Sequence, residues 1–124
     1  MNRFIAFGIC MAGGLMGSVA AAAVEVETGR AIYQARCAAC HSVEFNGVGP
    51  AHKGVYGRRI GQAVGYNYSP ALKAATGRWT AENLDKWLND PEKFLPGQKM
   101  GISLESVADR ANVIEYLKSL SPRE

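Results

Sequence analysis

Cysteine is scarce in this sequence of 124 residues, which has only three, and its charges nearly balance. Fourteen lysines and arginines against eleven acidic residues leave a net charge of +3, too small for the strongly basic surface of most nucleic-acid binders. No stretch alternates apolar and polar residues long enough to predict a sheet, and no internal repeat is visible. Hydrophobic residues make up 48% of the chain, which suits one globular domain and argues against disorder.

The N-terminal segment has the three parts of a secretory signal peptide. Arg3 gives a positive start, residues 4–19 are apolar or small apart from one serine, and four alanines follow. This layout predicts export. We therefore expect cleavage after Ala23, so that residues 1–23 are removed and residues 24–124 form one domain in the periplasm. The alternative is an uncleaved membrane anchor, because an apolar run of this length just spans a bilayer.

Only two cysteines remain after that segment is removed, and they are too close together to be the disulfide framework of an exported domain. They belong to Cys37-Ala38-Ala39-Cys40-His41, the C-x-x-C-H pattern of c-type haem attachment. Two cysteines at this spacing lie on one side of a helical turn and can add to both vinyl groups of one haem edge, while the adjacent histidine binds the iron. A thioredoxin-like pair would follow a strand, and a structural zinc site needs four ligands. The motif therefore favours covalent haem over both alternatives.

A haem iron bound by His41 needs a second axial ligand, and Met100 is the candidate. It is the one methionine of residues 24–124 and lies in a loop flanked by proline and glycine. Methionine is ordinarily core filler, but this uniqueness and position favour ligation. A His/Met pair raises the reduction potential and fills both axial positions, which favours an electron carrier over an enzyme. His52 is the rival ligand, and we expect it instead to be a surface or loop-bonding histidine.

Helices are predicted at both ends of the domain, with a Gly-rich loop region over residues 42–77 between them. Apolar residues at helix-like spacing cover 24–41, and a short helix is expected over 69–75. Thr80 is the expected cap of a helix that ends before a proline. Ser103 is the expected cap of a last helix that carries one apolar stripe.

On these residues the chain resembles class I cytochrome c, especially its mitochondrial and bacterial c2-like branch, over residues 24–120. Besides the haem motif, the resemblance rests on several short motifs spread along the chain. These are Gly47-Val48-Gly49-Pro50, Tyr56-Gly57-Arg58, Gly61-Gln62-Ala63, Gly65-Tyr66-Asn67-Tyr68, Trp79, Asn89-Asp90-Pro91 and Pro96-Gly97-Gln98-Lys99-Met100. The resemblance implies an all-α fold, in which helices and long Gly-rich loops wrap around one haem c attached through Cys37 and Cys40.

The resemblance also implies roles for particular side chains. The Pro50 carbonyl would accept a hydrogen bond from the His41 ring and so fix the axial ligand. Arg58, Tyr68 and Trp79 would donate to the haem propionates. The first and last helices would pack together through Gly29, Tyr33, Val113 and Tyr116.

Three positions depart from the family pattern. Trp87 stands where the family often has a tyrosine near the methionine sulfur, and an indole N–H can only donate. Leu72 stands where asparagine is common, and Gln98 replaces the usual threonine. We expect these departures to change the hydrogen bonding beside Met100 and to leave its ligation intact.

The sequence as a whole predicts a soluble, monomeric electron carrier of the periplasm that is not an enzyme. It would pass single electrons in a respiratory chain, between membrane complexes or dehydrogenases and an oxidase or reductase, without a nucleic-acid partner and without stable membrane insertion after cleavage. The resemblance implies docking through basic residues at the haem edge, and the candidates are Arg36, Lys53, Lys73, Lys86, Lys93 and Lys99. The alternatives are a dedicated haem subunit of one periplasmic dehydrogenase and a membrane-anchored cytochrome c.

Overall fold

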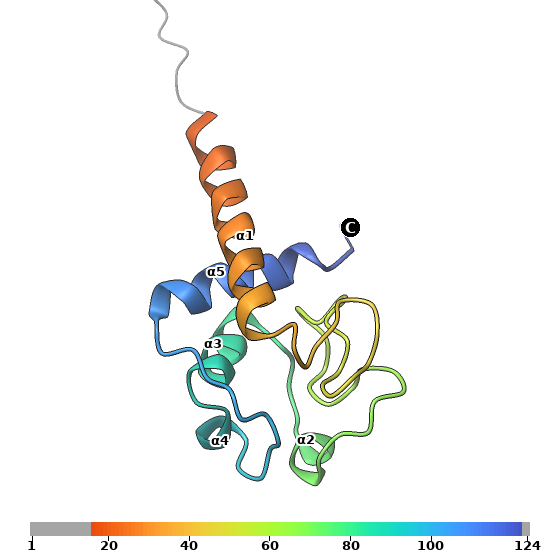
Figure 1. Cartoon of the computed structure of the whole chain (residues 1–124). Coiled ribbons are helices and arrows are strands. Elements are labelled where there is room, and N and C mark those ends of the chain that lie inside the picture. Colours follow the sequence, from red (N-terminus) through yellow and green to blue (C-terminus); the bar gives the residue numbers. More distant parts are fainter. Residues whose placement is uncertain (1–15, 123–124) are drawn as a thin grey trace, which may run out of the picture.

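The computed structural model describes residues 16–122 of the chain (Figure 1). This part forms five helices: α1 (Met16–Arg36), α2 (Pro70–Ala74), α3 (Ala81–Asn89), α4 (Pro91–Phe94) and α5 (Val107–Ser119). Within it, the β pairing consists of one isolated bridge between Arg59 and Arg78. The expectation of an all-α fold is confirmed.

Helices α1 and α5 cross and pack closely against each other (Figure 1). At the crossing, a side chain on Gly29 would collide with the backbone carbonyl of Asn112 in α5, so only glycine allows this approach. One turn further along α1, the Tyr33 ring lies 5.1 Å from the Tyr116 ring, and Val113 beside them is 1% exposed. The packing that the resemblance implied for these two helices is therefore confirmed.

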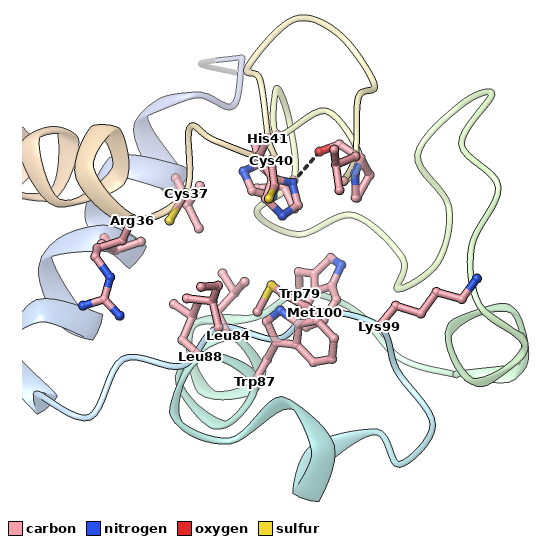
Figure 2. A pocket seen from close by; sticks show the side chains of 18 of the residues that line it. Arg36, Cys37, Cys40, His41, Trp79, Leu84, Trp87, Leu88, Lys99 and Met100 are labelled. Carbon is pink, nitrogen blue, oxygen red and sulfur yellow. Dashed lines mark hydrogen bonds between the residues drawn. The ribbon is translucent and has the colours of Figure 1, made fainter.

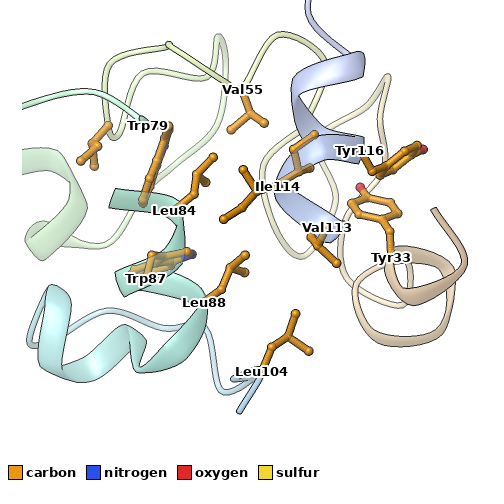
Figure 3. Close-up of a cluster of buried hydrophobic side chains, with 12 residues drawn as sticks. Tyr33, Val55, Trp79, Leu84, Trp87, Leu88, Leu104, Val113, Ile114 and Tyr116 are labelled. Atoms are coloured by element: carbon orange, nitrogen blue, oxygen red, sulfur yellow. The ribbon is translucent and has the colours of Figure 1, made fainter. Parts of the chain in front are cut away.

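Helix α3 supplies the opposite side of the core (Figure 3). Its N-cap is Thr80, as expected, whose side-chain oxygen accepts a hydrogen bond from the Asn83 N–H at 3.1 Å. Its apolar residues Leu84, Trp87 and Leu88 are all buried and face α5 and the loops. The short helix α4, which the sequence analysis missed, follows directly on α3.

The start of α5 differs from the prediction. Its N-cap is Ser106, whose side chain accepts from the Asp109 N–H at 3.2 Å, and not Ser103. The buried guanidinium of Arg110 donates to the carbonyls of Leu104 and Glu105, each at 2.9 Å. Because these carbonyls are bound to a side chain, the segment before Ser106 stays outside the helix.

Helix α1 also differs from the prediction at its end, since it stops at Arg36 rather than at residue 41. Its N-terminal half extends away from the rest of the molecule (Figure 1), and residues 21–23 are exposed. Residues 1–15 of the expected signal peptide lie outside the described residues. Among the residues that are described, no helix is both long and apolar enough to span a bilayer.

Candidate functional site

A cavity of about 360 Å³ lies between the C-x-x-C-H segment, the Gly-rich loops, α3 and the loop that carries Met100 (Figure 2). Its size suits a small molecule or cofactor, and its walls are mainly apolar, as in most such sites. All eight residues that the sequence analysis assigned to the site line this one cavity: Cys37, Cys40, His41, Pro50, Arg58, Tyr68, Trp79 and Met100. The fold therefore brings together residues from six separate stretches of sequence.

The two cysteines lie in a turn that follows α1 directly. The Cys37 N–H donates to the Tyr33 carbonyl at 2.8 Å, and the His41 N–H donates to the Cys37 carbonyl at 2.9 Å. Both thiols are free, with Cys37 half-buried and Cys40 exposed. Burial raises the pKa of Cys37, against an opposing effect of the nearby Arg36 charge. Among residues 16–122 no group of three or more His, Cys, Asp or Glu side chains could hold a metal ion.

The His41 ring is held on two sides. Its Nδ1 lies 2.8 Å from the Pro50 carbonyl oxygen, which can only accept, so Nδ1 carries the proton. The backbone of Gly49 packs so closely on the ring that any side chain there would collide with it. The remaining nitrogen, Nε2, is then unprotonated and able to bind a metal. Burial lowers the pKa of His41, and the bond to Pro50 opposes that shift.

His52 is not the surface or loop-bonding histidine that the sequence predicted. Its ring stacks on that of His41, with centroids 4.0 Å apart and planes 19° from parallel, and its Nδ1 lies 2.9 Å from the Tyr33 hydroxyl in α1. Burial, assisted by His41 and Arg58, lowers the pKa of His52 to about 3. Because the two histidines lie side by side, His52 cannot supply a ligand on the face opposite His41.

Met100 lies on the other side of the cavity from His41 and Cys40 (Figure 2). Its backbone N–H donates to the Gln98 side-chain oxygen at 2.5 Å. The Gln98 amide in turn donates to one Glu92 carboxylate oxygen at 3.2 Å, and the other accepts from the Gly97 N–H at 2.9 Å. Glu92 thus organises residues 95–101, the methionine loop. The sequence analysis missed this role because no sequence motif links α4 to this loop.

Apolar and aromatic side chains surround Met100. Trp87 is 9% exposed, and its ring lies 5.4 Å from that of Trp79 and 6.4 Å from that of Phe94. Leu72 lines the same cavity. Trp87 therefore places an indole on the cavity wall where the family often has a tyrosine hydroxyl. Leu72 places an alkyl group there where the family commonly has an asparagine amide.

Polar donors gather at another part of the wall. The two terminal nitrogens of Arg58 each lie 3.3 Å from the Ala51 carbonyl, whereas its Nε is buried and has no hydrogen-bond partner within the described part of the chain. The Tyr68 hydroxyl accepts from the Ala63 N–H at 2.9 Å, which leaves its own proton free to donate. Trp79 is joined to Arg58 through its backbone N–H at 2.9 Å. Buried donors without acceptors suit a group that carries carboxylates, as a haem does.

Known proteins share this sequence and this structure. A family model described as cytochrome c matches residues 26–121. The cytochrome c of Euglena viridis is 40% identical over 99 residues, covering 77% of this chain and 97% of that protein. Cytochrome c2 iso-2 of Magnetospirillum fulvum is 47% identical over 87 residues, covering 68% and 91%. Among solved structures, cytochrome cH from Methylobacterium extorquens is similar with a TM-score of 0.73 and 40% identity, covering 76% of this chain and 97% of that one.

Proposed function

Because the chain belongs to the cytochrome c family, we propose that it is a soluble periplasmic carrier of single electrons whose haem iron is bound between His41 and Met100. The chain binds one haem c covalently through Cys37 and Cys40 and is an electron carrier rather than an enzyme. Family membership does not by itself assign the axial ligands, the cellular location or the redox partners. These three assignments are the proposal.

The observation that carries the ligand assignment is the pair of opposed side chains in one cavity. The bond between His41 Nδ1 and Pro50 leaves Nε2 as the metal-binding nitrogen, and the sulfur of Met100 faces it from the methionine loop. A haem iron supplies a one-electron couple there, and thioether ligation favours a high reduction potential. If His41 and Met100 both bound the iron, no position on it would be left for a substrate.

Other residues of the cavity have separate tasks in this proposal. Trp87, Leu84 and Leu88 exclude water from the methionine side. The buried Nε of Arg58 and the free proton of Tyr68 would hold carboxylates of the cofactor. Because these side chains already surround the site, the protein would need to rearrange little when the haem gains or loses one electron. This suits an electron carrier.

Export remains part of the proposal. It rests on the signal-like sequence of residues 1–23 and is supported by the first turns of α1, which extend away from the core and are exposed at residues 21–23. If cleavage follows Ala23, the intact mass of the purified protein equals that of residues 24–124 plus one haem. Recovery of the uncut chain from membranes would instead support the membrane-anchored alternative.

Docking to redox partners is proposed at the methionine side of the haem edge. Lys53 and Lys86 already have acidic partners, Glu44 at 3.1 Å and Glu82 at 2.7 Å. Three other candidates are exposed and form no ion pair within residues 16–122: Lys73, Lys93 and Lys99. Arg36 donates to the Ser103 carbonyl and also lines the cavity. The unpaired lysines are free to attract an acidic partner.

Substitution of Met100 tests the ligand pair. Met100→Ala should abolish the near-infrared sulfur-to-iron band of the oxidised protein, while the haem stays attached because both cysteines are intact. The matched control is Val107→Ala, which shortens an apolar side chain that is 71% exposed and does not line the cavity. If the band survives in Met100→Ala, another group is the ligand and this part of the proposal is wrong.

A further inference from the structure

His52 has no task in the function proposed above, although it lines the same cavity. Its ring covers that of His41 in a nearly parallel stack, with centroids 4.0 Å apart. Such a stack restrains the neighbouring ring from turning, because rotation of either ring would bring its edge into the face of the other. The bond to Pro50 holds one edge of the His41 ring and the Gly49 backbone packs against it, and the His52 stack adds a third contact that opposes rotation of the ring.

His52 is itself held from two directions. The Tyr33 hydroxyl lies 2.9 Å from its Nδ1, and the Tyr33 ring meets it edge-on with centroids 5.5 Å apart. The His52 backbone N–H donates to the Ser42 carbonyl, one residue after His41, at 3.0 Å. Tyr33 is 2% exposed and is fixed against Tyr116 at the crossing of α1 and α5. The stack is therefore anchored to the crossing of α1 and α5, the most extensive contact between helices in residues 16–122.

We infer that His52 is a positioning residue, which Tyr33 holds in place and which sets the plane of the His41 ring. This inference rests on the proposed ligation of iron by His41. The plane of an axial imidazole governs how unpaired electron density spreads over an oxidised haem, so a fixed plane gives one electronic state rather than a mixture. Tyr33, His52 and His41 then form a continuous path of contacts from the helix crossing to the metal ligand.

Two variants of the intact haem protein test the inference. His52→Leu removes the stack and the hydrogen bond while keeping a side chain of similar bulk, and Tyr33→Phe removes only the hydroxyl. The readouts are the electron paramagnetic resonance g-values and the hyperfine-shifted proton resonances of the haem methyl groups in the oxidised protein. We expect both readouts to change in His52→Leu, and to change in the same sense but less in Tyr33→Phe. Tyr66→Phe is the matched control, because it deletes another tyrosine hydroxyl of the cavity wall, one that donates to Val48 at 2.6 Å.

Unchanged g-values and methyl shifts in both variants, with only a loss of thermal stability, would overturn the inference, since His52 would then be mere packing. Equal changes in the Tyr66→Phe control would also overturn it. If His52→Leu does not fold, Tyr33→Phe alone decides. The near-infrared band separates this result from the ligand proposal: its absence in the unaltered protein counts against Met100, whereas the methyl shifts still report the plane of His41.

Discussion

The buried Nε of Arg58 is the clearest single-residue feature of the cavity. Its terminal nitrogens have an acceptor in Ala51, but the Nε has none within residues 16–122. A buried donor without a partner costs about 1–3 kcal/mol, so this Nε needs an acceptor that the described residues do not supply. A cofactor carboxylate fits that requirement, and the charge of Arg58 then lies close to the haem.

Replacement of Arg58 should therefore change the reduction potential. The oxidised haem carries one more positive charge than the reduced haem, so a nearby positive charge favours the reduced form and raises the potential. Arg58→Met should lower the potential, and a loss of about 1.4 kcal/mol corresponds to about 59 mV for one electron. Spectroelectrochemical titration measures this value, with exposed Arg59→Met as the control. A potential that is equal or higher in Arg58→Met would refute the placement of this charge.

At the residue scale, the eight side chains that the sequence analysis assigned to the site all line one cavity. The C-x-x-C-H spacing and the one methionine of residues 24–124 pointed to four of them, and the family resemblance implied the other four. His52 was predicted wrongly, since a histidine in a Gly-rich loop gives no sign of where that loop returns. Only the fold shows that this loop stacks the His52 ring on that of His41 and places its Nδ1 beside the Tyr33 hydroxyl. Glu92 was missed for the same reason.

At the scale of elements, the methionine loop depends on one carboxylate. Glu92 in α4 accepts from both the Gly97 N–H and the Gln98 amide, and Gln98 holds the Met100 backbone. These three hydrogen bonds, called the Glu92 brace below, hold the loop in place of regular secondary structure. Its rigidity decides how easily Met100 can be displaced from a metal.

Removal of this brace should make Met100 easier to replace. In Glu92→Ala, the affinity of the oxidised protein for added imidazole should rise, by about fivefold if the brace contributes about 1 kcal/mol, the usual net value of a hydrogen bond. Glu105→Ala is the control, because Glu105 uses its backbone carbonyl rather than its carboxylate in the bond to Arg110. Equal imidazole affinities in both variants would show that the brace does not act on Met100.

Helix positions were predictable where local signals act alone, as at Thr80 and at Ser69, which caps α2. They were wrong where a side chain outside the capping pattern intervenes. Ser103 has the same capping chemistry as Ser106, but Arg110 binds the carbonyls between them and delays the start of α5. These contacts depend on the conformation of the Arg110 side chain, which Asp85 of α3 also binds at 2.7 Å, and the capping pattern does not contain that information.

At the scale of the whole molecule, the chain has a net charge of +3, which falls to +2 once residues 1–23 with Arg3 are removed. So small a net charge steers partners weakly, and the positions of the charges therefore matter more than their sum. We predict that electron exchange with the ferricyanide anion slows as salt rises, because the Debye length shrinks from about 10 Å at 0.1 M to about 3 Å at 1 M. Lys93→Glu and Lys99→Glu should each slow it further at low salt. Arg30→Glu, an exposed change on α1 away from the cavity, should have little effect.

The same rates decide whether these lysines form the docking site. Equal effects from all three charge reversals would show that only net charge matters, and a rate independent of salt would remove electrostatic docking altogether. Either result would leave the electron-carrier function intact. A partner complex that resists high salt would instead favour the alternative of a dedicated haem subunit.

The absorption spectrum of the reduced protein under carbon monoxide tests most directly whether the iron is closed to outside ligands. With His41 and Met100 on opposite sides of the iron, the spectrum at neutral pH should be the same with and without the gas. Met100→Ala should bind carbon monoxide under the same conditions, which shows that the gas can reach the iron. If carbon monoxide changes the spectrum of the unaltered protein, the gas binds the iron. That result would contradict ligation by both His41 and Met100, and with it the claim that the iron is closed to outside ligands.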